Sequence, residues 1–105
     1  MDTLNGIRRI AGSDIGRRVA DQHAQALARV LDTIAPCPAV VSTDARTHTD
    51  TIYLTDDPGD VTKAAATMPP ITVRTYREGA KGRLRYITIT TLGDSTEIAK
   101  QVIEI

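Results

Sequence analysis

Residues 69–92, PPITVRTYREGAKGRLRYITITTL, constrain the fold more than any other part of the chain. Both halves of this stretch are rich in Thr, Ile, Val and Tyr, which favour β-strands, and Gly79 and Gly82 lie between the halves. The pattern predicts one β-hairpin with a five-residue loop over 78–82. The other segments of the chain can be placed relative to this hairpin.

The hydrophobic pattern also predicts how the two strands of the hairpin pair. With the loop over 78–82, Val73 pairs with Ile87 and Ile71 with Ile89, so four aliphatic side chains share one face. A slip by one residue would mix apolar and polar side chains on each face. The opposite face is then expected to carry Thr72, Arg74, Tyr76, Leu84, Tyr86, Thr88 and Thr90.

Residues 13–35 carry the strongest helical pattern in the chain. Ser13 can cap the helix, Asp14 suits its N-terminal dipole, and Pro36 ends it. Such a helix would be about 30 Å long, whereas a domain of this size has a radius of gyration of about 13 Å. The helix must therefore cross the whole body or project from it. Its apolar stripe consists of Ile15, Val19, Ala26, Leu27, Val30, Leu31 and Ile34.

Shorter elements are expected on either side of the hairpin. Residues 39–43 and 49–55 alternate as two strands joined by a polar loop. A short helix follows, with Asp57 as its cap and Pro58 at its first position. The tail GDSTEIAKQVIEI resembles a capping box followed by a helical apolar face, and we favour a helix there over a strand.

These elements predict an α+β fold in a single domain over 13–105, preceded by a loosely ordered arm over 1–12. The expected sheet is mixed and four-stranded, built from two hairpins, with the long helix, the middle helix and the C-terminal helix on one face. The other face is then open. It would hold all three tyrosines of the chain, Tyr53, Tyr76 and Tyr86, among threonines and Arg74.

Charge and composition exclude several classes of protein. The 13 Lys and Arg balance the 13 Asp and Glu, so no global field draws the chain to nucleic acid or to an acidic membrane. No apolar run approaches the ~20 residues of a membrane span. Cys37 is the only cysteine, which excludes an internal disulfide and a multi-cysteine metal site. A cytoplasmic protein is expected, without contact to a membrane.

Catalytic and metal-binding motifs are weak in this sequence. His48-x-Asp50, with Asp44 and three aspartates downstream, is the one arrangement that could serve a small metal-dependent hydrolase. Asp57 and Asp60 are already explained by helix capping, and His48 and Asp50 by a polar loop. His23 falls within the apolar stripe and is expected to be a core histidine. We predict no catalytic residue, no metal ligand and no cofactor.

Nucleic-acid binding is an alternative that rests on the hairpin. Its basic tip, which we define as Arg77, Lys81, Arg83 and Arg85, lies near Tyr76 and Tyr86. A sheet can bind single strands by stacking bases on aromatic rings while basic residues hold phosphates. The balanced charge and the absence of Phe and Trp lower this expectation.

A non-enzymatic protein-binding or regulatory module is the function that the sequence favours. Tyr and Arg are enriched at binding hot spots, and an open sheet face beside a long amphipathic helix offers two surfaces for a protein partner or for a second copy in a homodimer. The residues expected to bind the partner are Tyr53, Arg74, Tyr76, Leu84 and Tyr86.

Overall fold

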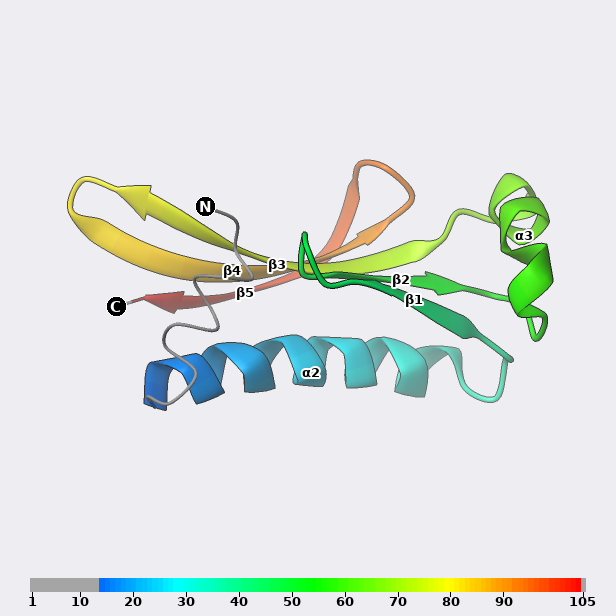
Figure 1. Cartoon of the computed structure of the whole chain (residues 1–105), viewed down its shortest axis with the longest axis horizontal. Helices are drawn as coiled ribbons and strands as arrows, with labels where there is room; N and C mark the ends of the chain where they lie inside the picture. Colours follow the sequence, from blue (N-terminus) through cyan, green and yellow to red (C-terminus); the bar gives the residue numbers. More distant parts are fainter. Residues whose placement is uncertain (1–13, 105) are drawn as a thin grey trace.

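The computed structural model describes residues 14–104, which form an α+β fold with one long helix lying along one face of a five-stranded antiparallel sheet (Figure 1). The expected arm over 1–12 lies outside the described residues. Among residues 14–104, no helix is long and apolar enough to cross a membrane.

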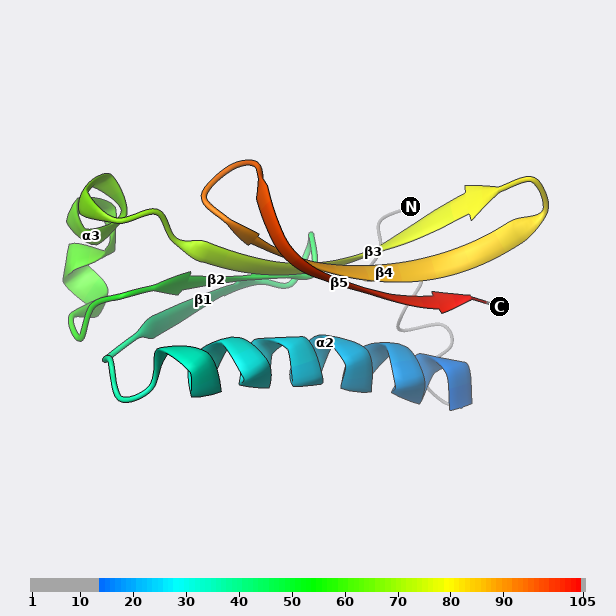
Figure 2. The ribbon, with the colours of Figure 1, turned by 180° about the vertical axis from the view of Figure 1, so that it is seen from behind.

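The long helix α2, Asp14–Ile34, confirms the element predicted over 13–35. Its 21 residues span about 32 Å at 1.5 Å per residue, and the longest axis of the molecule is 43 Å. The helix therefore crosses the body rather than projecting from it, as both views of the ribbon show (Figures 1 and 2). It ends before Pro36, which cannot continue a helical hydrogen-bond ladder.

The sheet contains β1 (Val40–Asp44), β2 (Thr49–Tyr53), β3 (Ile71–Ala80), β4 (Arg83–Leu92) and β5 (Thr96–Glu104), paired in sequence order. Every neighbouring pair is antiparallel, so the expected mixed sheet of four strands is wrong. The expected C-terminal helix is also wrong, because this segment is β5. It pairs with the edge of β4 that β3 leaves free. Ala99, Gln101 and Ile103 lie on the side of β5 that faces α2.

The short middle helix is confirmed, but it does not cover the sheet. It consists of the 3-10 turn η1 (Pro58–Asp60) and α3 (Val61–Thr67). The Asp57 carboxylate accepts a hydrogen bond from the Gly59 amide at 2.9 Å, as expected of a cap. Because α3 sits at one end of the sheet (Figure 1), the chain returns from it as an antiparallel neighbour of β2.

The β3–β4 hairpin is confirmed, but its predicted register is wrong. The turn has two residues, Lys81 and Gly82, both with positive φ (53° and 76°), as a type I′ turn requires. Thr75 therefore pairs with Thr88, and Val73 with Thr90. This register exchanges the faces of β4: its even-numbered residues, Leu84 to Thr90, face α2, and Ile87 and Ile89 face the opposite side.

Two apolar clusters form the core beneath α2. The first joins Val19 to Tyr86 and Ile103, with Ile15 and Leu84 packed against them. The second joins Ala26 to Ile52 and Val73. The partly buried residues that complete the second cluster are Leu27, Val30, Ile34, Ala39 and Ile71. Between the two clusters the interface is polar.

Candidate functional site

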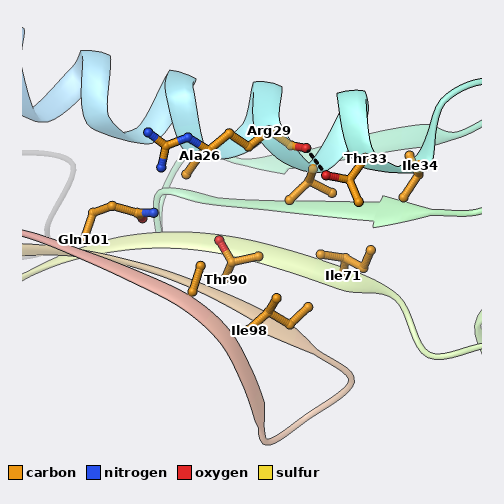
Figure 3. A pocket seen from close by; sticks show the side chains of 10 residues that line it. Ala26, Arg29, Thr33, Ile34, Ile71, Thr90, Ile98 and Gln101 are labelled. Atoms are coloured by element: carbon orange, nitrogen blue, oxygen red, sulfur yellow. Dashed lines mark hydrogen bonds between the residues drawn. The ribbon is translucent and has the colours of Figure 1, made fainter.

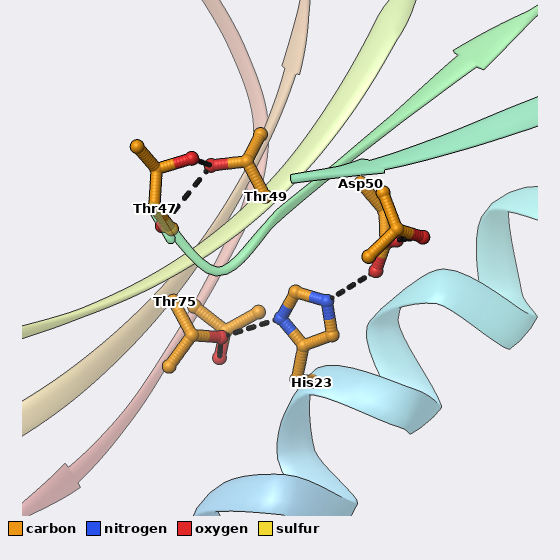
Figure 4. A network of polar contacts seen from close by, with 7 residues as sticks. His23, Thr47, Thr49, Asp50 and Thr75 are labelled. Atoms are coloured by element: carbon orange, nitrogen blue, oxygen red, sulfur yellow. Dashed lines mark hydrogen bonds and ion pairs between the residues drawn. The ribbon is translucent and has the colours of Figure 1, made fainter. Parts of the chain in front are cut away.

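A network of buried polar side chains occupies the centre of the interface between α2 and the sheet. His23 projects from α2 between β2 and β3 (Figure 4). Its Nδ1 lies 2.7 Å from Thr75 Oγ1 and its Nε2 lies 2.7 Å from Asp50 Oδ2. The other carboxylate oxygen of Asp50 accepts a hydrogen bond from Thr43 Oγ1 at 2.5 Å. His23 and Asp50 are only 8% and 7% exposed, so both depend on these partners.

The network continues across the sheet to β4. Thr75 Oγ1 lies 2.8 Å from Thr88 Oγ1, which accepts a hydrogen bond from Gln22 Nε2 at 3.1 Å. When the His23 ring is neutral, one direction satisfies each group: Thr88 donates to Thr75, Thr75 donates to His23 Nδ1, and His23 Nε2 donates to Asp50. This tautomer is assigned from the partners. The result is a continuous chain of hydrogen bonds from Gln22 to Asp50.

A hydroxyl, an imidazole and a carboxylate in line also make up the nucleophile, base and orienting group of many hydrolases. Here Thr75 and Thr88 are both 0% exposed, so a substrate could not reach either hydroxyl. The arrangement is therefore suited to hold α2 at one position on the sheet. This network was not predicted from the sequence, because the predicted register of the hairpin did not place Thr75 opposite Thr88.

His48 lies beside this network in the turn between β1 and β2. Its ring centroid is 4.6 Å from that of His23, and its Nε2 is buried and has no hydrogen-bond partner among residues 14–104. Burial lowers the pKa of His48 from its ordinary value, the nearby His23 acts in the same direction, and Asp50 opposes them. His48 therefore favours the neutral form.

The carboxylates of the weak His48-x-Asp50 arrangement, from which we predict no metal site, have hydrogen-bond partners of their own. Both carboxylate oxygens of Asp50 already have partners, and the Asp44 carboxylate accepts a hydrogen bond from the Arg46 amide. Within the described range 14–104, no three His, Cys, Asp or Glu side chains are grouped to hold a metal ion.

Three of the five residues predicted to bind a partner share the face opposite α2. Strand alternation places Tyr53 of β2 and both Arg74 and Tyr76 of β3 on that side, since Ile52 and Val73 point into the core. The guanidinium carbon of Arg74 lies 5.2 Å from the centroid of the Tyr76 ring, within the range of a cation–π contact.

For Tyr86 and Leu84, the predicted position on the open face is wrong. Tyr86 is 1% exposed and packs beneath α2 with Val19 and Ile103. Leu84 is partly buried against the same cluster. The cause is the two-residue turn, which turns the even-numbered residues of β4 toward the helix. Neither side chain is presented to a partner on the opposite face.

A shallow hollow of about 410 Å³ lies on the face opposite α2, beside the Arg74–Tyr76 contact. Its walls come from β3, β4 and the turn that follows β4. The lining residues are Thr72, Arg74, Tyr76, Ile89, Thr91, Gly93 and Asp94. Ile89 was expected beneath the helix, so the sequence could not indicate this hollow.

The four residues of the basic hairpin tip lie at the far end of β3 and β4, but two of them are paired with acids. Arg83 Nη1 donates a hydrogen bond to Glu104 at 2.9 Å, and Arg85 forms an ion pair with Glu78. Arg77 and Lys81 are exposed. Because two of the four basic residues are paired with acids, the net positive charge at the tip is half of what the four residues alone would carry.

The face opposite α2 thus keeps a coherent group of predicted residues, while the basic tip is partly neutralised. Comparison of the chain with models of known protein families, with curated proteins and with solved structures found no match in any of the three. A function for this chain therefore rests on the geometry of its own residues.

Proposed function

We propose that this protein is a small non-enzymatic binding or regulatory module that recognises a protein partner through the sheet face opposite α2. The observation that carries the proposal is the hollow of about 410 Å³ beside the Arg74–Tyr76 contact. Tyr53 continues the same face along β2. We place the module in the cytoplasm, where a reducing environment suits the exposed free thiol of Cys37.

The residues around the hollow have the chemistry of a recognition site. Tyr76 is held by a ten-residue strand and covered by Arg74, so little side-chain freedom remains to be lost on binding. Ile89 adds an apolar wall, and Asp94 adds a negative charge to the positive charge of Arg74. A loop or peptide with an apolar anchor between charged neighbours fits this combination.

Single-stranded nucleic acid is a weaker candidate. Two of the four cations of the basic hairpin tip are in ion pairs, Arg83 with Glu104 and Arg85 with Glu78. Phosphate contacts supply most of the affinity for nucleic acid, so this pairing opposes it. Tyr86 is buried and cannot stack on a base.

Affinity capture from an extract of the native host, compared between variants, tests the proposal. Tyr76→Ala and Arg74→Ala are expected to lose proteins that the unmodified chain captures. Lys63→Ala, in an exposed position of α3, is the matched control and is expected to retain them. An unchanged set of captured proteins in Tyr76→Ala would exclude this face.

Titration with single-stranded oligonucleotides at low and physiological salt tests the nucleic-acid alternative. Oligonucleotide binding that Tyr76→Ala weakens would support that alternative.

A further inference from the structure

Two hollows that share lining residues lie along the margin between α2 and β5, and we call them together the groove. One half is a hollow of about 210 Å³ with apolar walls from α2, β3 and β5 (Figure 3). The other half, of about 290 Å³, is lined mostly by polar side chains of α2, among them Arg18, Asp21 and Gln25. Arg29 and Gln101 line both hollows, so they mark the junction between the apolar and the polar half.

A β-bulge shapes the apolar half. Thr91 pairs with Glu97 and Thr90 with Ala99, which leaves Ile98 as an extra residue in β5. Both Ile98 and Ala99 consequently line the apolar hollow. Ile98 is 56% exposed, the highest fraction among the exposed large apolar side chains of the described residues. Filling the hollow would remove this side chain from water.

Arg29 places a positive charge at the junction. With the Gln101 amide oriented so that its nitrogen donates to Thr88 O at 3.2 Å, its oxygen accepts from Arg29 Nη1 at 3.1 Å. No carboxylate within residues 14–104 forms an ion pair with Arg29. The other N–H groups of its guanidinium are thus available to an anion in the groove.

We propose that this groove binds a small monocarboxylate, with its apolar tail between α2 and the bulge of β5 and its carboxylate on Arg29. A cavity of about 150 Å³ holds a benzene ring, so the apolar hollow suits a tail of roughly six to eight carbon atoms. Two arginines and one aspartate give the polar half a net charge of +1, from Arg18, Arg29 and Asp21. That charge matches a carboxylate better than a phosphate dianion.

Titration with hexanoate, octanoate and octan-1-ol, followed by amide NMR shifts and calorimetry, tests this assignment. We expect saturable octanoate binding with shifts centred on Thr33, Ile98 and Ala99, and an affinity that rises about three- to four-fold per added methylene. Arg29→Gln should weaken octanoate binding about tenfold and leave octan-1-ol binding unchanged. Ile98→Ser should weaken the binding of both octanoate and octan-1-ol.

Controls separate this groove from the surface of the proposed function. Lys63→Gln and Tyr76→Ala should bind octanoate like the unmodified chain, because neither residue lines the groove. Ile98 is exposed, so Ile98→Ser should keep the fold, which a thermal unfolding curve verifies. The absence of saturable binding would overturn the proposal, as would shifts centred on Tyr76. Equal effects of Arg29→Gln on octanoate and octan-1-ol would overturn it as well.

Discussion

The two ends of the interface between α2 and the sheet differ from its centre. The ends are apolar clusters, built around Tyr86 at one end and Ile52 at the other. The centre is the hydrogen-bonded network from Gln22 through His23 to Asp50. Burial of apolar surface is non-directional and stabilises many related arrangements. Hydrogen bonds at 2.7 Å require specific atoms to meet, so the centre fixes where α2 lies along the sheet.

The largest effect is expected at the apolar end. Tyr86→Ala should lower the free energy of unfolding by about 4 kcal/mol, because it removes a large buried side chain and leaves a cavity. Urea unfolding at 25 °C measures this change. The matched control is Tyr53→Ala on the opposite face, where a change of less than about 1 kcal/mol is expected. Similar losses of unfolding free energy in Tyr86→Ala and Tyr53→Ala would contradict the conclusion that the core lies on the α2 face of the sheet.

Loss of the Asp50 carboxylate from the central network should lower the free energy of unfolding nearly as much as Tyr86→Ala does. Asp50→Ala removes the acceptor of both His23 Nε2 and Thr43 Oγ1, and we expect a loss of about 3 kcal/mol. Asp44→Ala, which alters an exposed aspartate at the end of β1, is the control. A double-mutant cycle with His23→Leu should show coupling between positions 23 and 50. Additive effects would mean that the two side chains stabilise the fold independently.

A smaller loss is expected when the network is interrupted without a change in volume. Thr75→Val removes the hydroxyl that joins His23 Nδ1 to Thr88, and the free energy of unfolding should fall by about 2 kcal/mol. Thr51→Val, on the opposite face of β2, should be neutral within about 0.5 kcal/mol. If Thr75→Val were equally neutral in chemical unfolding, the centre would be no more specific than the ends.

The β3–β4 turn is a second determinant of register, independent of the network. Lys81 adopts a positive φ of 53°, which Asn tolerates better than Lys. Lys81→Asn should raise the free energy of unfolding by about 0.5 kcal/mol, measured as a higher midpoint in urea. A lower midpoint would show that the Lys81 side chain itself stabilises the turn.

The smallest expected effect concerns pH and His48. Because its pKa is below 6.5 in the folded state, its contribution to stability is present above that value and is lost as pH falls through the folded pKa. The free energy of unfolding should therefore decrease between pH 7 and pH 5. His48→Asn keeps a residue that accepts the φ of 51° and should flatten this decrease. Identical slopes for both proteins would contradict a role for His48.

The sequence predicted elements better than it predicted their pairing. The helix with its stop at Pro36, the cap at Asp57 and both hairpins follow from local chemistry. The predicted register is wrong because Ile and Thr alternate in β4, so the sequence is compatible with burial of either face, and the pattern favours the aliphatic face. The structure instead buries Thr88 with His23 and Thr75, which pattern alone cannot reveal.

The sequence predicted only those parts of the candidate site whose positions depend on a single strand and not on how two strands pair. Arg74 and Tyr76 share a face by alternation within β3, whatever strand lies beside them. The placement of Tyr86 depended on the register and was therefore lost with it. The hollow beside Arg74 and Tyr76 depends on the turn around Gly93, and the apolar hollow between α2 and β5 depends on the bulge at Ile98. Neither the turn nor the bulge has a clear sequence signal.

The sequential order of the five strands has a consequence for how the chain folds. Each strand pairs with its neighbour in the sequence, and every connection except the one through α3 is a short turn, so most of the sheet can assemble with little loop-closure entropy. The contacts of α2 are different, because His23 meets Thr75 across 52 positions and Gln22 meets Thr88 across 66. We therefore expect docking of the helix onto a preformed meander to be the slow event in folding. Substitutions in the central network would then slow refolding more than substitutions in the turns.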